Sequence, residues 1–183
     1  MTYTKRALAA VVAAVLMLSM LAGCGMFGET DDNSSAYTVT DMTGEMLEDL
    51  IRKEPFSGSM MQENALLAAQ TKALARSYIS RIDLGEVSAE DVENAAGNEL
   101  YELLISKSLT SIMQTECGAA IYTKDVAREE MLEDLANQIS NGWMALYGNY
   151  YCTGVCIIYI ESKDDPSVAG WFATWEYENI FGI

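Results

Sequence analysis

The segment 150–160 constrains the fold most, because it has the composition of a β-strand with apolar side chains on both faces. Successive side chains of a strand point to opposite faces of a sheet. One face would carry Thr153, Val155, Ile157 and Tyr159, and the other would carry Cys152, Cys156, Ile158 and Ile160. Since both faces need cover, we expect helices to pack on either side of the sheet that contains this strand.

A second strand is predicted at 170–177, which is also rich in β-branched and aromatic residues. The polar, turn-rich segment 161–169 separates the two, so they should form an antiparallel hairpin. We therefore predict an α+β fold, namely an α-β-α sandwich with a small antiparallel sheet and a C-terminal hairpin.

Helical periodicity dominates the chain before this hairpin. We expect one helix at 43–54 and a longer one at about 61–82. The residues 88–91 have the spacing of a capping box and should begin a third helix. Asp125 is a good N-cap for a fourth helix. Because no internal repeat or change of composition divides these elements, we predict a single globular domain over 43–183.

The amino terminus has the pattern of a secretory signal. Two basic residues precede an uncharged run at 7–20, which is shorter than the roughly 20 apolar residues that cross a bilayer. The run ends in Leu21-Ala22-Gly23-Cys24, which closely resembles the lipobox of bacterial lipoproteins. This resemblance implies that residues 1–23 are a signal peptide cleaved before Cys24. It also implies that the Cys24 sulfur carries a diacylglyceryl group with acyl chains such as palmitate.

Such a lipid would hold the chain at the extracytoplasmic face of a bacterial cell membrane, exposed at the cell surface. The residues 24–42 are rich in Gly, Ser, Asp and Asn and are predicted to form a flexible linker. The net charge of −16 argues against nucleic acid as a partner, because phosphate binding needs clustered Lys and Arg. We expect membrane attachment through the lipid, with the acidic domain held away from anionic headgroups.

The chain contains no His, which excludes several familiar mechanisms. Neither Ser-His-Asp nor Cys-His activation of a nucleophile is available, and no imidazole can bind a metal. The acidic segment 91–97 does not have the order of an EF-hand, and no glycine-rich phosphate-binding motif occurs. We therefore expect neither a metal nor an organic cofactor. A pair of carboxylates across a cleft would still suffice for glycoside hydrolysis.

Four segments together resemble a known family. They are the Ala-rich helix 65–75 after Asn64, Asn141-Gly142-Trp143-Met144, Gly154-Val155, and Gly170-Trp171-Phe172-Ala173-Thr174-Trp175. In this order they resemble the bacterial CAP superfamily (cysteine-rich secretory, antigen-five and pathogenesis-related proteins) over about 60–183. The pocket of that family is built from two His and two acidic residues and can hold a metal ion. Here the family's Gly-Glu-Asn motif would fall at 118–121, where Ala replaces both polar residues. The resemblance therefore implies the scaffold without its pocket.

Three cysteines remain if Cys24 carries lipid: Cys117, Cys152 and Cys156. The last two lie four residues apart, roughly 13 Å on a regular strand that rises about 3.3 Å per residue, which is too far for a disulfide. Cys117 could form a disulfide with Cys152 or with Cys156. Alternatively, all three are small apolar core residues with free thiols.

Aromatic residues gather near the carboxyl terminus, and Tyr147, Tyr150, Trp171 and Trp175 are candidate binding residues. The competing interpretation is that they pack in the core. We expect a lipid-anchored surface module, not an enzyme, that binds a protein, a peptide or a cell-envelope glycan. One alternative is a carboxylate-dependent hydrolase of an envelope polymer, which predicts an open cleft with two facing carboxylates and a raised pKa on at least one. The other is a structural or assembly lipoprotein.

Overall fold

The computed structural model describes residues 36–54, 60–82, 89–107, 115–146 and 150–179. All of them belong to one compact unit, Ser35–Ile183. The predicted signal peptide, Cys24 and Tyr147 lie outside the described residues. The expectations that concern them therefore stay predictions.

A five-stranded sheet forms the centre of this part of the chain, with the strands in the order β1-β4-β5-β3 and with β2 beside β4. Along the chain the elements are β1 (Tyr37–Asp41), α2 (Thr43–Lys53), β2 (Gln62–Glu63), α3 (Ala65–Ile82), α4 (Ala89–Lys107), β3 (Thr115–Thr123), α5 (Arg128–Ala145), β4 (Tyr151–Ser162) and β5 (Ala169–Glu178). The long strands pair antiparallel, whereas the short β2 pairs with β4 in parallel. The pairing of β4 with β5 confirms the predicted hairpin.

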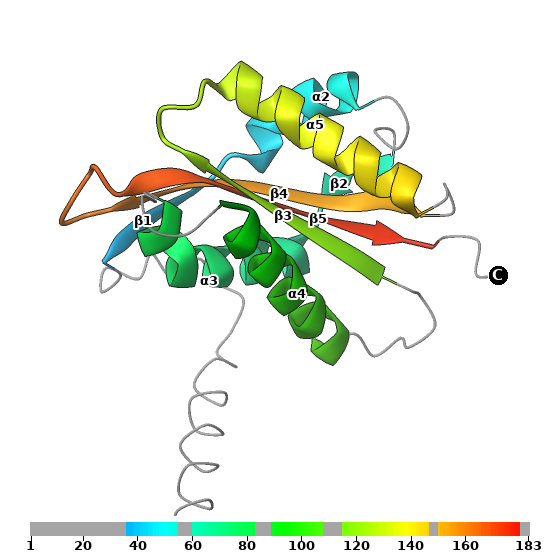
Figure 1. The fold of residues 1–183 in the computed structure, drawn as a ribbon, viewed down its shortest axis with the longest axis horizontal. Helices are drawn as coiled ribbons and strands as arrows, with labels where there is room; N and C mark the ends of the chain where they lie inside the picture. Colours follow the sequence, from blue (N-terminus) through cyan, green and yellow to red (C-terminus); the bar gives the residue numbers. More distant parts are fainter. Residues whose placement is uncertain (1–35, 55–59, 83–88, 108–114, 147–149, 180–183) are drawn as a thin grey trace, which may run out of the picture. The chain divides into compact units, whose positions relative to one another are not determined.

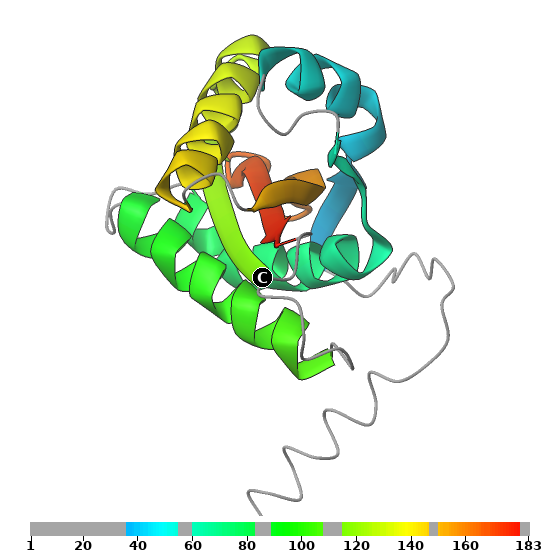
Figure 2. The same ribbon diagram turned by 90° about the vertical axis from the view of Figure 1, so that its right-hand side faces the viewer.

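Helices cover both faces of the sheet, as Figures 1 and 2 show. Helices α3 and α4 pack on one face, where they meet Cys156, Ile158 and Ile160 of β4. Helices α2 and α5 pack on the other face, where they meet Val155 and Ile157. The expected α-β-α arrangement is confirmed, and its reason is the one predicted, because β4 is apolar on both sides.

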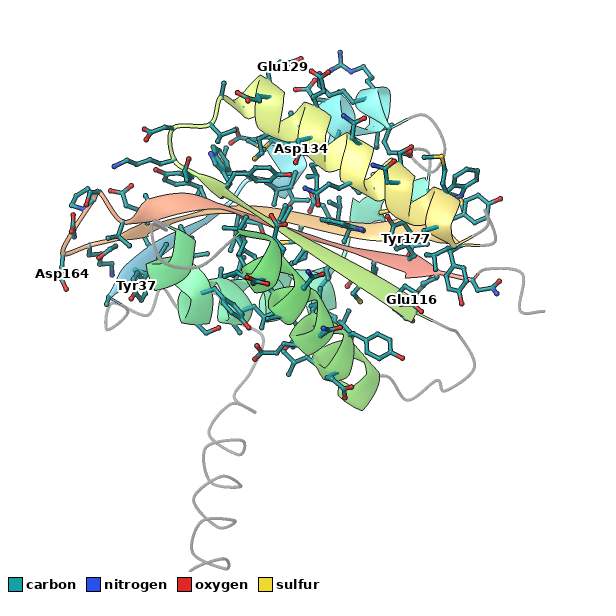
Figure 3. The ribbon with its side chains drawn as sticks, viewed as in Figure 1. Tyr37, Glu116, Glu129, Asp134, Asp164 and Tyr177 are labelled. Atoms are coloured by element: carbon teal, nitrogen blue, oxygen red, sulfur yellow. The ribbon has the colours of Figure 1, made fainter. Side chains whose placement is uncertain are left out.

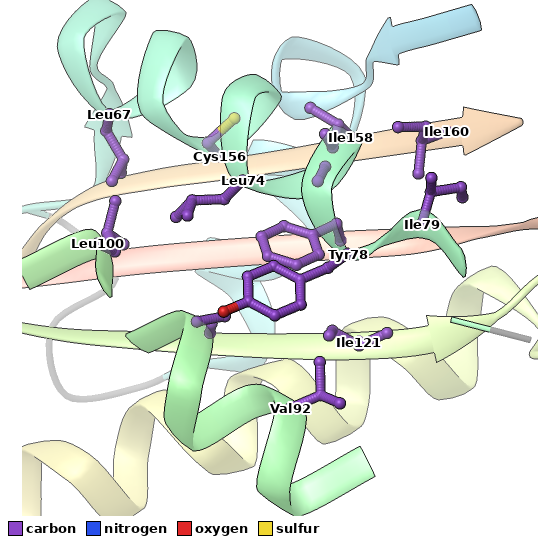
Figure 4. Packing of buried hydrophobic residues seen from close by; sticks show 14 of the residues in the cluster. Leu67, Leu74, Tyr78, Ile79, Val92, Leu100, Ile121, Cys156, Ile158 and Ile160 are labelled. Atoms are coloured by element: carbon purple, nitrogen blue, oxygen red, sulfur yellow. The ribbon is translucent and has the colours of Figure 1, made fainter. Parts of the chain in front are cut away.

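The core under α3 and α4 is organised around one aromatic pair (Figure 4). The ring of Tyr78 on α3 stacks on Phe172 of β5, with the ring centroids 6.4 Å apart and the planes 15° apart. The Tyr78 hydroxyl donates a hydrogen bond of 2.9 Å to Glu99 on α4. Tyr78 therefore joins both helices of this layer to the middle of the sheet.

A β-bulge near the start of β4 changes the direction of one predicted side chain. Cys152 pairs with Tyr177 and Gly154 pairs with Glu176, so Thr153 is an extra residue in β4. Cys152 consequently packs in the core under α2 and α5, on the opposite face from Cys156. The prediction that these two cysteines share a face is wrong, because the bulge breaks the alternation of the strand.

Part of the predicted linker 24–42 forms a strand. Tyr37–Asp41 forms β1, which pairs antiparallel with the end of β4. Tyr37 and Val39 pack against the core under α3 and α4. The prediction of a flexible linker through 42 is therefore wrong for 37–41, where alternating aromatic and β-branched residues fit the edge of a sheet.

Helix α2 lies where it was predicted, but α3 and α5 begin later than predicted. Asn64 precedes α3, and its side-chain oxygen accepts hydrogen bonds from the backbone N–H groups of Leu66 (2.9 Å) and Leu67 (3.2 Å), as an N-cap does. The cap residue of α5 is Ala127, not Asp125, and its side chain makes no capping hydrogen bond. No helix among the described residues carries an apolar stretch long enough to cross a membrane.

The strand β3 was not predicted. Its centre consists of Gly118, Ala119 and Ala120, which have weak strand propensity. Gly118 is nevertheless required, because it pairs with Trp175 of β5 and a Cβ atom there would collide with the indole ring. The small residues of β3 thus make room for the large side chains of β5.

We predict that Gly118→Ala lowers the free energy of unfolding by about 1–3 kcal/mol, because the added methyl group overpacks the site under Trp175. Urea denaturation of the single variant and of the same change in a Trp175→Leu background measures the coupling. The cost should be smaller in the Trp175→Leu background. An equal cost in both backgrounds would show that the indole is not what excludes the methyl group.

Candidate functional site

An open pocket of about 400 Å³ lies where β3 ends and α5 passes over the sheet. It is lined by Tyr122, Val126, Glu130, Glu133, Asp134 and Asn137. Figure 3 shows Asp134 on the part of α5 that lies above β3. The pocket therefore combines an aromatic and an aliphatic wall with a row of acidic and amide side chains.

The packing of α5 produces this row. Its buried residues are Met131, Leu132, Leu135, Ala136 and Ile139. With that stripe fixed against the sheet, Glu130, Glu133, Asp134 and Asn137 share an exposed flank at helical spacing. The strand β3 brings Tyr122 to the foot of the same flank.

Tyr122 is held by its hydroxyl group. This group donates a hydrogen bond of 2.9 Å to Asp134, which also accepts one of 2.8 Å from the Gln138 amide. Burial, the nearby Asp134 charge and this hydrogen bond raise the pKa of Tyr122 well above its ordinary value. The hydroxyl therefore stays protonated at neutral pH, and its ring is fixed as one side of the pocket.

Two basic side chains near α5, Lys53 and Arg128, form ion pairs that involve α2. Lys53 pairs with Glu129 at 2.5 Å, and Arg128 reaches Glu45 and Asp49 of α2 at 3.9 and 3.7 Å. Among the described residues, no ion pair involves the pocket carboxylates Glu130, Glu133 or Asp134. The hydrogen bond with Glu129 and then the charge of Glu133 raise the pKa of Lys53, so this one carboxylate of the pocket, Glu133, is partly compensated from the side of α2.

A second polar group lies buried under α3. Glu176 of β5 is 6% exposed and accepts a hydrogen bond of 2.5 Å from the side-chain amide of Asn64, the N-cap of α3. A Cβ atom on the neighbouring Gly154 would collide with the Glu176 carboxylate. Burial raises the pKa of Glu176, the Asn64 hydrogen bond opposes that change, and the charge of Glu178 adds to it. Glu176 thus attaches the start of α3 to the sheet.

A third polar cluster joins β1 to the helices on both faces. Asp41 accepts hydrogen bonds from the backbone N–H (3.1 Å) and hydroxyl (2.7 Å) of Thr43, and it pairs with Lys72 of α3 at 3.2 Å. Burial would raise the pKa of Asp41, but these hydrogen bonds and the Lys72 charge lower it overall. The Thr43 hydroxyl in turn accepts the backbone N–H of Ile157 at 2.9 Å. These contacts occupy the polar atoms of Asp41 and Thr43 and hold the start of α2 against the sheet.

All three described cysteines are free thiols. Cys117 lies on β3 and the other two on β4, with β5 between them, so two strand spacings of about 4.8 Å separate them. That distance is beyond disulfide reach, and the proposed disulfide of Cys117 with Cys152 or Cys156 is not formed. Burial raises the pKa of Cys156 to about 11 and, together with Glu176 and Glu116, that of Cys117 to about 12. The three cysteines therefore pack as small core residues with free thiols.

The candidate aromatic residues do not form one exposed surface. Trp175 is 5% exposed and fills the core above Gly118, so its prediction as a binding residue is wrong. Trp171 is half-buried and packs edge-on against Tyr159, with centroids 4.9 Å apart, and Tyr150 packs against the core under α2 and α5. The pocket beside α5 is instead lined by Tyr122, which the sequence analysis did not single out.

Known proteins give no further assignment, since no protein-family model, no curated protein and no solved structure matches the chain. The resemblance to the CAP superfamily therefore stays a prediction. Within the described ranges, no group of three or more Cys, Asp or Glu side chains is arranged to hold a metal ion.

The raised pKa of Glu176 predicts a pH-dependent stability. A carboxyl group whose pKa is raised by folding stabilises the fold below its unfolded pKa, about 4.3 for Glu, and that stabilisation is lost as pH rises through the raised value. We therefore expect Glu176→Gln to unfold at higher urea concentration than the original chain at pH 7. The difference should shrink as the pH falls toward about 4, where the carboxyl is protonated.

The exposed Glu116 on the adjacent strand provides the control for this experiment, because Glu116→Gln removes a charge without removing a buried one. Glu116→Gln should not reproduce the pH-dependent difference. A Glu176→Gln chain that is less stable at pH 7, or whose difference from the original is the same at both pH values, would contradict the account.

Proposed function

We propose that the chain is a lipid-anchored, extracytoplasmic binding module that recognises a positively charged segment of a protein or peptide in the pocket beside α5. The observation that carries the proposal is the acidic row of Glu130, Glu133 and Asp134, which form no ion pair among the described residues, next to the ring of Tyr122. No catalytic step is part of this proposal.

The chemistry of the pocket favours a Lys or Arg side chain. The aliphatic stem of such a side chain packs on aromatic and apolar surface, while its charged end meets carboxylates. Tyr122 and Val126 supply the apolar surface, and the flank of α5 supplies the carboxylates. A neutral glycan would bury the same carboxylates without neutralising them, which is why we favour a cationic peptide or protein segment over a glycan.

The anchor rests on the sequence motif that ends at Cys24. A lipid at this position would leave the domain attached to the outer side of the membrane by the linker that precedes β1. The chain carries a net charge of −16, which repels anionic headgroups and attracts cationic partners. Anchor and pocket thus fit one role, the capture of a basic segment near the membrane.

The hydrolase alternative has less support. It requires two facing carboxylates in a cleft, one of them with a raised pKa. Glu176, a carboxyl group whose pKa is raised, lies buried under α3 and does not line the pocket. The carboxylates that do line the pocket lie along one flank of a single helix instead of on opposing walls.

The pocket can be tested by calorimetric titration of the full chain in detergent with an end-blocked hexapeptide of alternating Lys and Val. We predict that the triple variant Glu130→Gln, Glu133→Gln, Asp134→Asn weakens binding at least tenfold, because each charge-assisted contact typically contributes more than a neutral one. Binding should also weaken as salt is raised.

A charge-matched variant separates the pocket from general attraction to an acidic protein. Glu48→Gln, Glu102→Gln, Asp164→Asn removes the same charge from exposed positions elsewhere. This control should bind the peptide nearly as well as the original chain. An equal loss of peptide affinity in both triple variants would exclude the pocket as the binding site.

The anchor predicts a specific mass and location. The original chain should be found in the membrane fraction, without residues 1–23 and with the mass of an attached lipid. Cys24→Ser should lose the lipid mass, because the hydroxyl cannot replace the alkylated thiol. Mass spectrometry of the fractionated cells checks both, with Cys117→Ser as a control that keeps the lipid. A Cys24→Ser chain with the lipid mass intact would rule the anchor out.

A further inference from the structure

The strand β1 forms the border of the sheet opposite β3 (Figure 2). It pairs with the last part of β4, from Ile158 to Ser162, while β2 pairs with an earlier part of β4 at Gly154 and Val155. Among the described residues, no strand pairs with the other side of β1. A strand in this position presents a row of backbone donors and acceptors to any extended chain beside it.

The hydrogen bonds to β4 show which backbone groups of β1 face outward. The N–H of Met42, the residue after β1, donates to the Ile157 carbonyl of β4 at 2.8 Å. In an antiparallel pair the backbone groups of every second residue point the same way. The even-numbered residues of β1 therefore bond to β4, and the odd-numbered residues 37, 39 and 41 present their backbone groups to the outside.

The side chains of β1 do little to keep another strand away. Thr38 and Thr40 are exposed, whereas Val39 is half-buried against the core under α3 and α4. The one charged residue of the strand, Asp41, pairs with Lys72 at 3.2 Å. The register with β4 is continuous, and β1 contains neither Pro nor Lys. Bulges, Pro and Lys are features with which edge strands commonly avoid a partner, and β1 lacks all three.

We propose that β1 pairs antiparallel with β1 of a second copy of the chain, so that the two sheets join into one. The pairing is centred on Val39, because this register joins all five residues of the strand and matches the outward backbone groups of the two copies. On one face of the sheet, Thr38 lies opposite Thr40 of the second copy. On the other face, Val39 meets Val39 of the second copy. Thr–Thr pairs across neighbouring strands stabilise a sheet.

The charge of β1 favours a second copy over a cationic peptide. The carboxylate that this strand carries, Asp41, is already paired with Lys72, so it gives a Lys or Arg side chain little to bind. A strand of β-branched residues fits this edge better, and β1 itself is such a strand. The net charge of −16 on each copy opposes association, so the pairing should strengthen as salt screens that charge. The pocket beside α5 lies next to β3, at the opposite border, and stays open in both copies.

Sedimentation equilibrium of the full chain in density-matched detergent, with micelles in large excess, measures the pairing. The original chain should form dimers that tighten as salt is raised. The variant Thr38→Lys, Thr40→Lys and the variant Thr38→Glu, Thr40→Glu should each pair with themselves at least tenfold more weakly, because like charges then lie opposite each other. An equimolar mixture of the two variants should form dimers again, since opposite charges then meet across the strands.

A charge-matched variant tests whether the effect belongs to β1. Asn94→Lys, Asn98→Lys adds the same positive charge at exposed positions of α4. This control should pair at least as tightly as the original chain, because it lowers the net negative charge of each copy. An original chain that stays monomeric at every salt concentration would overturn the proposal. Thr38→Lys, Thr40→Lys pairing as tightly as the control would also overturn it, because the dimer interface would then lie elsewhere.

Amide hydrogen exchange, measured by nuclear magnetic resonance on the unsubstituted chain, tests the same pairing without depending on the folding of a variant. Exchange at the Val39 amide, which faces outward, should slow at least tenfold as the protein concentration rises and dimers form. Exchange at the Thr38 amide, which faces β4, should change little. Slow exchange at Val39 that is the same at every concentration would assign the edge to another segment of the same chain and overturn the proposal. Slowing that requires the Lys–Val hexapeptide would assign the edge to a cationic peptide and overturn it as well.

Discussion

The burial of β4 on both faces is the constraint on which the rest of the structure depends. Cys156, Ile158 and Ile160 need one helical layer, and Val155 and Ile157 need another. Burying each such side chain typically contributes about 1.5–3 kcal/mol, so neither face can be left in water. The chain meets this requirement with α3 and α4 on one side and α2 and α5 on the other.

The candidate binding surface is a consequence of the same packing. Once Leu132, Leu135 and Ile139 fix α5 on the sheet, its acidic flank must lie above the outer strand β3. The other flank is neutralised by Lys53 and by Arg128, which contacts α2. Charge is therefore distributed unequally around one helix, and the flank whose carboxylates form no ion pair among the described residues is the one next to Tyr122.

The sequence was informative where the pattern is strong and local. The hairpin and the layered arrangement follow from the β-branched and apolar residues of 150–160 and 170–177, and α2 follows from its helical spacing. The strand β3 could not be foreseen, because Gly118, Ala119 and Ala120 have weak strand propensity and are placed by the large side chains of β5. The bulge at Thr153 is likewise a pairing feature that alternation alone does not reveal.

The site was harder to predict than the fold for a similar reason. The acidic residues of α5 have the spacing of an ordinary solvated helix face, and only the fold brings Tyr122 beside them. Trp175 is of a residue type that often binds ligands, yet its indole ring packs over the small Gly118 and lies in the core. The position of the acidic flank of α5 beside β3 comes from tertiary packing alone.

The most direct test of the central claim is chemical-shift mapping of the full chain during titration with the Lys–Val hexapeptide. The account predicts that backbone amide shifts concentrate at Tyr122, Asp134 and Asn137, on one face of the domain. Shifts of the same size spread over the exposed acids of α2 and of the turn between β4 and β5 would contradict it. In that case the acidic charge would attract the peptide without a specific site.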